Sequence, residues 1–226
     1  MKKFDVITIF PGIFESFLNE SLLARAINKK LISIRAHNLR GWANDAHKTV
    51  DDRPYGGGAG MVLKIEPIFR AVKSLSSYKV RKVKTRVILL SAKGKQFTQK
   101  DARRLAKYNQ LIFICGRYEG VDERVAQHIT DEEISVGPYV LFGGEVPAMT
   151  IIEAVSRLIP GVVAKEESIK FESFSDKNAA TKEYPQYTRP EVFEPTIDRK
   201  KTWKVPKILL SGDHKKITSW RKKHSV

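Results

Sequence analysis

Cysteine is almost absent from this sequence of 226 residues, which contains Cys115 alone. A single cysteine excludes an intramolecular disulfide framework and a zinc site built from thiolates. Long hydrophobic runs are also lacking, since none approaches the roughly 18 residues that a membrane-spanning helix requires. The first ten residues, MKKFDVITIF, carry Asp5 inside the apolar stretch and precede no small-residue cleavage site. We therefore expect a cytoplasmic protein with no signal peptide and no membrane partner.

Acidic residues are scarce relative to basic ones: 25 Asp and Glu stand against 41 Lys and Arg, for a net charge of +16. The basic excess is concentrated in two segments. Residues 70–107 contain 13 basic residues and one acid, residues 199–226 contain 10 and one, and the remainder carries −5. Two dense basic segments on a mildly acidic remainder favour a nucleic-acid partner over evenly solvated surfaces.

Apolar runs and helical periodicities alternate along the first two thirds of the chain. The expected strands are 4–10, 31–36, 87–90, 111–115 and 139–142. The expected helices are 14–26, 65–75, 98–107, 121–129 and 150–158, the third opened by a capping box at Thr98 and Asp101. This alternation predicts an α/β fold with a mostly parallel sheet.

The character of the sequence changes after Pro160. Residues 165–194 are polar, include two prolines and have no sustained periodicity, which is typical of a functional linker. Residues 207–226 look helical again, with Ser211 or Asp213 as the N-cap. We therefore divide the chain into a main α/β domain at 1–161, a linker at 162–194 and a basic helical domain at 195–226.

Glycine-bearing turns follow three of the apolar segments. They are residues 91–94 (SAKG), 116–120 (GRYEG) and the pair Gly143-Gly144 within 139–149. Ligands bind at the carboxyl ends of strands in open α/β sheets, and glycines there let the backbone approach the ligand. Three such turns predict a pocket for a nucleotide-like molecule. A fourth glycine-rich stretch, residues 54–61, lacks the lysine motif of a phosphate-binding loop and is expected to be a loop.

Other chemistry-bearing residues give weaker signals. Cys115 ends a strand, and burial as a small hydrophobe is favoured over a role as nucleophile. The five histidines do not have metal-ligand spacing, so we expect no metal site. Acids beside the glycine turns are better candidates for ligand contacts than ordinary surface acids; they are Glu119, Asp122, Glu123 and Glu145.

Several longer strings occur together in this sequence. They are VDDRPYGGGAGM (50–61), CGRYEGVDE (115–123), ISVGPYVLFGGEVPAM (134–149), VSRLIPG (155–161), YTRP (187–190), and residues 209–214 with Trp220-Arg221. With them the chain resembles the bacterial tRNA (guanine-N1)-methyltransferases over nearly its whole length. The resemblance implies methylation of N1 of guanosine-37 in tRNA, a SPOUT-type α/β domain with a deep trefoil knot, a small C-terminal helical domain that grips tRNA, and a homodimer with its active sites at the interface.

The resemblance also implies the site residues. S-adenosylmethionine would be held by Leu90, Ser91, Gly116, Tyr118, Glu119, Ile134, Val136, Gly137, Tyr139, Leu141, Gly143, Gly144 and Pro147. Arg157 matches the arginine near the guanine, where it would stabilise negative charge growing on O6. The general base would come from the linker, where Glu183 occupies the position of the family's aspartate and Asp176 is a rival. Magnesium is implied only as a possible helper.

The linker is where this sequence departs most from the family pattern. Ser173-Phe174 and the YTRP motif remain, but the glycine-leucine-leucine before the base is missing and the segment is longer. Ala92-Lys93 also replaces the usual proline-glutamine, and Pro138 replaces a common aspartate. Two alternatives therefore stay open: a diverged, non-catalytic tRNA-binding protein, and a knotted methyltransferase that acts on another RNA nucleotide.

Overall fold

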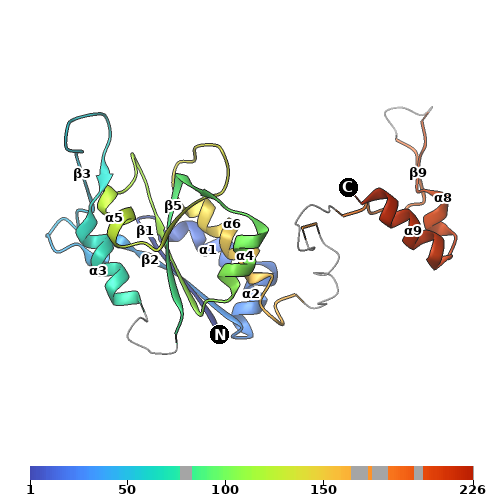
Figure 1. Ribbon diagram of the computed structural model, residues 1–226, viewed down its shortest axis with the longest axis horizontal. Helices are drawn as coiled ribbons and strands as arrows, with labels where there is room; N and C mark the ends of the chain where they lie inside the picture. Colours follow the sequence, from blue (N-terminus) through green and yellow to red (C-terminus); the bar gives the residue numbers. More distant parts are fainter. Residues whose placement is uncertain (77–82, 164–172, 175–182, 196–200, 226) are drawn as a thin grey trace. The chain divides into compact units, whose positions relative to one another are not determined.

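The computed structural model describes residues 1–76, 83–163, 173–174, 183–195 and 201–225 (Figure 1). The chain divides into two compact units, Met1–Glu166 and Glu167–Val226. Among the described residues, no helix combines the length and the apolar character needed to cross a membrane.

A five-stranded sheet with the order β2-β1-β6-β5-β7 forms the centre of the first unit. Every neighbouring pair is parallel, which confirms the predicted α/β fold with a parallel sheet. The central strand β6 is buried at every residue, as expected for the apolar run 111–115, and its one polar residue, Gln110, donates to Asp5 and to the carbonyl of Leu75. The strands are β1 (Lys2–Thr8), β2 (Ile32–Asn38), β5 (Thr85–Gln96), β6 (Gln110–Cys115) and β7 (Glu132–Ser135).

Helices cover both faces of this sheet (Figure 1). One core forms under α1 (Glu15–Asn19), α2 (Ser21–Asn28), α4 (Gln99–Ala106) and α6 (Glu145–Ser156), and the other under α3 (Ile65–Leu75) and α5 (Glu123–His128). Strand β6 contributes side chains to both cores, because successive side chains of a strand point to opposite faces of the sheet. Phe113 and Cys115 enter the first core, and Ile112 and Ile114 enter the second.

Local sequence signals set several of the boundaries. Helix α3 has the predicted limits, and α4 begins with the predicted capping box between Thr98 and Asp101. The helix expected at 14–26 is instead a 3-10 turn (Pro11–Phe14) followed by α1 and α2. The break occurs at Glu20, which is extended, and Ser21, whose φ is 57°.

Two expectations near the end of the sheet were wrong. Residues 139–142 form an exposed loop, and the edge strand is instead β7, which carries two glutamates in four residues. Helix α6 begins at Glu145, five residues before its expected start, with Pro147 in its first turn, where a missing N–H is tolerated.

Strand β5 is unusually long and pairs with β7 twice. Ile134 is the partner of both Leu90 and Lys95, so the residues between them bulge out of the ladder while the strand continues to Gln96. Gly94 makes the return possible: a Cβ there would lie 2.6 Å from the backbone carbon of Glu133 and from the nitrogen of Ile134.

The remaining elements are short. In the first unit, a 3-10 helix spans Leu39–Trp42, and the antiparallel pair β3 (Asp51–Asp52) and β4 (Val62–Leu63) carries the glycine-rich loop. The second unit contains the antiparallel pair β8 (Val192–Phe193) and β9 (Trp203–Lys204), then α8 (Lys207–Leu210) and α9 (His214–His224). Asp213 caps α9, as one of the two predicted N-cap residues.

Candidate active site

A cavity of about 440 Å³ opens at the carboxyl ends of β5, β6 and β7. The three glycine-bearing turns that the sequence singled out all line it. Because parallel strands end at the same edge of the sheet, turns distant in sequence meet there. The volume falls within the range of roughly 300–1,000 Å³ that is typical of small-molecule sites.

Backbone contacts fix the turns against one another. Gly144 N–H donates to the carbonyl of Gly116 over 3.0 Å, and Arg117 pairs with Gly143 in an antiparallel bridge. A Cβ on Gly144 would lie 2.6 Å from the Cα of Cys115, so this approach requires glycine. Close backbone packing therefore forms one wall of the cavity.

Twelve of the thirteen residues assigned to the methyl donor line this one cavity. The exception is Gly137, whose carbonyl accepts a 2.9 Å hydrogen bond from Ser135 Oγ. A Cβ on Gly137 would lie 2.3 Å from the ring of Tyr139, so Gly137 leaves space for a lining side chain instead. The structure thus brings together the residues that the sequence spreads over 58 positions, from Leu90 to Pro147.

A buried ion pair supports the wall formed by Gly116 and Gly143. Arg117 Nε lies 2.9 Å from Glu145 Oε2, and Glu145 is only 1% exposed. Thr8 Oγ1 donates to the other carboxylate oxygen over 2.6 Å. The Arg117 guanidinium also stacks over the ring of Phe10, 4.8 Å from its centroid. Sequence reasoning flagged Glu145 but missed Arg117 and Thr8, which no motif connects to it.

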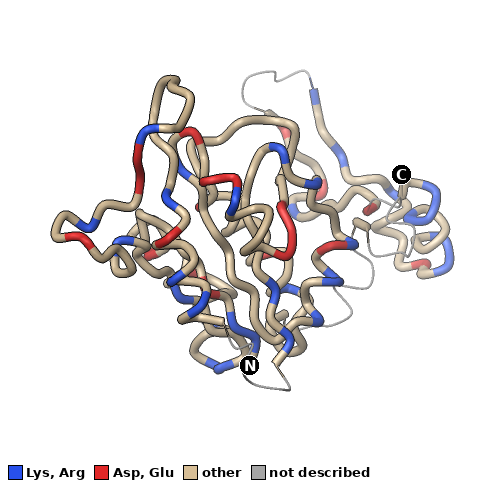
Figure 2. Tube along the Cα trace, turned by 60° about the vertical axis from the view of Figure 1, so that its left-hand side comes forward, with Lys and Arg blue, Asp and Glu red and all other residues tan. Residues whose placement is uncertain are grey.

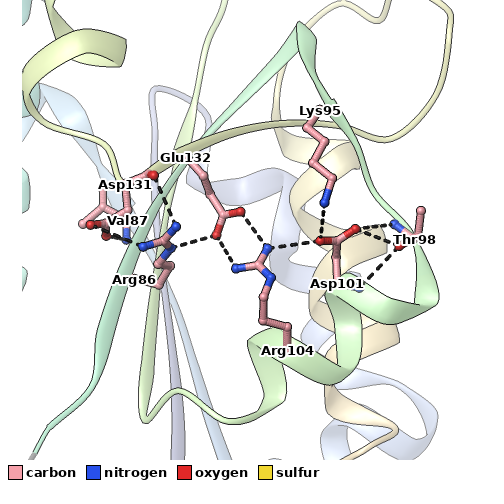
Figure 3. Close-up of polar contacts among 8 residues, drawn as sticks. All are labelled: Arg86, Val87, Lys95, Thr98, Asp101, Arg104, Asp131 and Glu132. Atoms are coloured by element: carbon pink, nitrogen blue, oxygen red, sulfur yellow. Dashed lines mark hydrogen bonds and ion pairs between the residues drawn. The ribbon is translucent and has the colours of Figure 1, made fainter. Parts of the chain in front are cut away.

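A second polar network holds β7, and we call it the Glu132 clamp (Figure 3). Arg86 of β5 donates to Glu132 over 2.9 Å, and Arg104 of α4 donates to both carboxylate oxygens over 2.9 and 2.7 Å. Asp101 accepts from Arg104 and from Lys95, which lies beyond the register shift of β5. The clamp therefore joins both halves of β5 to the strand that leads into the cavity.

The pKa values in the Glu132 clamp follow from these contacts. Burial acts to raise the pKa of Glu132, but hydrogen bonds from Arg104 and Arg86 outweigh it and hold the value below 4.5. The pKa of Asp101 is likewise lowered, because hydrogen bonds from Thr98, Lys95 and Arg104 outweigh its burial. Both carboxylates are therefore charged at neutral pH.

Cys115 is a buried core residue, in agreement with the interpretation favoured from sequence. It is 2% exposed, and burial raises the pKa of its thiol well above the usual value. A thiol without thiolate character is a poor nucleophile, so covalent chemistry at this residue is not supported.

The residues expected to act on the guanine lie elsewhere in the chain. Arg157 is half-buried at the C-terminal end of α6, whereas the cavity lies at the N-terminal end of that helix. Glu183 belongs to the second unit, where its side chain is exposed and its N–H donates to Ser173 Oγ over 3.0 Å. Asp176 lies outside the described residues.

The second unit carries the C-terminal basic segment. Lys215, Lys216 and a run of basic residues from Arg221 to Lys223 lie on α9 (Figure 2). Rings pack beside this helix: Tyr187 lies 6.4 Å from Trp220, and Arg221 stacks on Tyr184. Within the described part of the chain, no three His, Cys, Asp or Glu side chains gather as a metal site would require.

Comparison with known proteins gives one consistent result. The family model described as tRNA (Guanine-1)-methyltransferase TrmD matches residues 1–226. A tRNA (guanine-N(1)-)-methyltransferase of Dictyoglomus turgidum is 51% identical over 226 residues, covering 100% of this chain and 86% of the relative. Proteins of the same name from Citrifermentans bemidjiense (49% identity, 99% and 85% covered) and Endomicrobium trichonymphae (46%, 99% and 94%) are also similar.

Proposed function

This chain belongs to the tRNA (guanine-1)-methyltransferase family and is an enzyme that methylates N1 of guanine in tRNA, and we propose that its target is guanosine-37 and its methyl donor S-adenosylmethionine. The observation that carries the proposal is the cavity, in which twelve residues matched to the donor site from sequence lie together. We also assign the activity to the cytoplasm.

The residues of the cavity fit this donor. Leu90, Ile134, Leu141 and Pro147 offer apolar surface for an adenine ring, and the glycine turns offer backbone groups for the ribose and the amino-acid end. Glu119 adds a carboxylate that suits a cationic ligand. When bound, S-adenosylmethionine supplies an electrophilic methyl group on a positively charged sulfur. The chain's task is then to orient the guanine and to manage its proton.

Two side chains are proposed to act on the guanine. Its N1 is a poor nucleophile while protonated, so the Glu183 carboxylate accepts the N1 proton as general base. Negative charge then grows on O6, and the guanidinium of Arg157 stabilises it in a site that excludes water. Glutamate carries its carboxylate on an arm one methylene longer than the family's aspartate, and the longer linker accommodates this difference.

The enzyme is proposed to be a homodimer with each active site at the interface. Helix α6, with 12 residues, is about 18 Å long, so Arg157 and the cavity of its own chain are at opposite ends of it. This separation favours delivery of Arg157 to the cavity of a partner protomer. The loop beside the cavity exposes apolar side chains that an interface would cover, since Val140 is 87% and Phe142 94% exposed.

The proposal extends to the architecture and to tRNA binding. The double pairing of β5 with β7 around Ile134 is consistent with a trefoil knot in the α/β domain at 1–161. The residues 162–194 act as the linker, and the helices in 195–226 grip tRNA. The basic side chains of α9 suit the phosphate backbone, and Tyr184 and Tyr187 offer rings for stacking.

Mutagenesis of the two proposed residues tests the mechanism. With tRNA transcripts that carry guanosine or adenosine at position 37, we expect methyl transfer only to the guanosine transcript. Glu183→Ala and Arg157→Ala should abolish transfer while donor binding persists, and Asp176→Ala should retain it. Loss with Asp176→Ala alone would reassign the base. A wild-type protein that binds donor and tRNA without turnover would favour the non-catalytic alternative. The same assay is repeated with and without magnesium to test whether the ion assists.

Mixed dimers test whether the active site is shared. Arg157→Ala lacks the arginine, and Gly144→Ala is expected to bind the donor at least tenfold more weakly, so with the donor kept well below the dissociation constant of that variant each variant alone should have little activity. After exchange of subunits, half of the dimers combine one of each and contain one intact site. Activity should then recover to on the order of a quarter of the wild-type value. No recovery, with subunit exchange verified, would contradict the shared site.

A further inference from the structure

The cavity has a charge opposite in sign to that of the chain. Its lining includes two cations, Lys93 and Arg117, and three carboxylates, Glu119, Glu123 and Glu133. Arg117 is neutralised by the buried Glu145 just outside the lining. Lys93 is then opposed by three carboxylates, which leaves a formal charge of −2 in a protein whose net charge is +16. Clefts lined by one sign of charge concentrate the field that a ligand experiences.

Lys93 compensates only one of these carboxylates. Its ammonium lies 2.5 Å from Glu123 Oε2. The pKa of Lys93 is raised by this hydrogen bond first and, more weakly, by the charge of Glu133, so Glu133 lies within electrostatic range of it. One cation cannot neutralise both acids, and Glu119 remains as well.

Glu133 faces the cavity, whereas the preceding residue, Glu132, points to the other side of the strand. Successive residues of a strand point to opposite sides, and Glu132 is held outside the cavity by Arg86 and Arg104 (Figure 3). Gly94 packs against the backbone of Glu133 and fixes its position. Glu133 lines the cavity, and its Oε1 is buried with no hydrogen-bond partner among the described residues. Because this oxygen is covered by protein, it acts on a ligand in the cavity through its charge rather than by direct contact, and no hydrogen bond from the described residues offsets that charge at Oε1.

We infer that Glu133 is a specificity-determining residue of this cavity, whose carboxylate, together with Glu119, favours the cationic methyl donor over the neutral product. The inference rests on the proposed function. In the reaction the methyl group leaves the sulfonium sulfur for guanine N1, the N1 proton passes to the base, and the sulfur keeps the electron pair of the broken bond. The donor thereby becomes a thioether and loses the positive charge on its sulfur, so the attraction between that atom and the carboxylates is lost once transfer is complete.

This selectivity acts on binding rather than on the chemical step. Positive charge on sulfur diminishes in the transition state, so a carboxylate near it stabilises the bound donor more than the transition state. Removing the charge of Glu133 should weaken donor binding and leave the single-turnover rate at saturating donor undiminished. A merely structural role for Glu133 would lower both.

The test compares two ligands that differ only in the methyl group and its charge. The dissociation constants of S-adenosylmethionine and S-adenosylhomocysteine are measured by calorimetry for wild type, Glu133→Gln, Lys93→Gln and the surface control Glu20→Gln. Charges several ångströms apart in a partly shielded site change affinity by on the order of tenfold. We expect Glu133→Gln to reduce the preference for the donor by about tenfold, Lys93→Gln to increase it, and Glu20→Gln to leave it unchanged.

The two substitutions should change the preference for the donor in opposite directions. Damage to the fold would not raise that preference, so an increase in Lys93→Gln identifies an electrostatic effect. Lys93 is exposed, so its replacement should leave the fold intact and keep the test valid if Glu133→Gln folds poorly. A preference unchanged within twofold in both Glu133→Gln and Lys93→Gln would overturn the inference while leaving the donor site in place. Failure of the wild type to bind either ligand would instead overturn the proposed function.

Discussion

Replacing Glu132 by glutamine removes the charge at the centre of the Glu132 clamp while preserving the shape of the side chain. The native carboxylate accepts one hydrogen bond from Arg86 and two from Arg104, all of 2.9 Å or less. A glutamine amide offers one acceptor oxygen and turns its NH₂ group towards a guanidinium that also donates. The amide oxygen can replace Oε1, which both arginines contact, but the bond from Arg104 Nη2 to Oε2 is lost and that donor then faces the NH₂ group.

The expected loss of stability follows from the number and burial of these bonds. Hydrogen bonds to charged groups contribute roughly 1.5–3 kcal/mol each, and less where water reaches them. Glu132 is 16% exposed and its two arginines 27% and 36%, so we discount the sum to about 2–3 kcal/mol. For a unit of this size the melting temperature should fall by about 5–10 °C.

The assay is urea unfolding followed by circular dichroism at pH 7 and at acidic pH, with Glu20→Gln as the control. Because the folded pKa of Glu132 is lowered, the stability it contributes is present above its ordinary value of 4.5 and is lost as pH falls through the folded value. The difference between wild type and variant should therefore shrink in acid. A difference below about 0.5 kcal/mol at pH 7, within the range of ordinary surface changes, would refute the reasoning.

Three further predictions concern the cavity and its surroundings. Gly144→Ala should weaken donor binding at least tenfold and lower the free energy of unfolding by about 1–3 kcal/mol, because the added Cβ meets backbone atoms. Gly41→Ala, which has open space around it, should change neither donor binding, measured by calorimetry, nor stability, measured by thermal melts. Cys115 should resist iodoacetamide at pH 8 until the protein is unfolded, and rapid native labelling with loss of activity would contradict its burial. Phe142→Asp should convert the dimer to a monomer in sedimentation, and an unchanged dimer would exclude this loop from the interface.

The position of the cavity could be predicted from sequence because two simple signals coincide there. The apolar run 87–90 is followed by a glycine-bearing segment at 91–94, where β5 shifts register, strand β6 ends in the glycine-bearing turn at 116–120, and the pair Gly143-Gly144 opens α6 at the same edge. The walls between these turns could not be predicted. Arg117 and Glu145 form their ion pair across 28 positions, and no local pattern encodes it.

The last strand of the sheet shows how tertiary contacts override local pattern. The apolar residues 139–142 favoured a strand, yet they form an exposed loop, because a short apolar run does not distinguish a buried strand from a surface available for association. The real strand, β7, has the unpromising sequence EEIS. Its first acid, Glu132, is tolerated because Arg86 and Arg104, distant in sequence, hold its carboxylate from outside.

The position of the methylated atom is the most direct test of the account. An unmodified tRNA transcript with guanosine at position 37, and its twin with adenosine there, are incubated with labelled S-adenosylmethionine and the wild-type enzyme, and the products are mapped by mass spectrometry of nuclease fragments. The account predicts 1-methylguanosine at position 37 of the first transcript and no methylation of the second. Methylation at another nucleotide, or equal labelling of both transcripts, would contradict it.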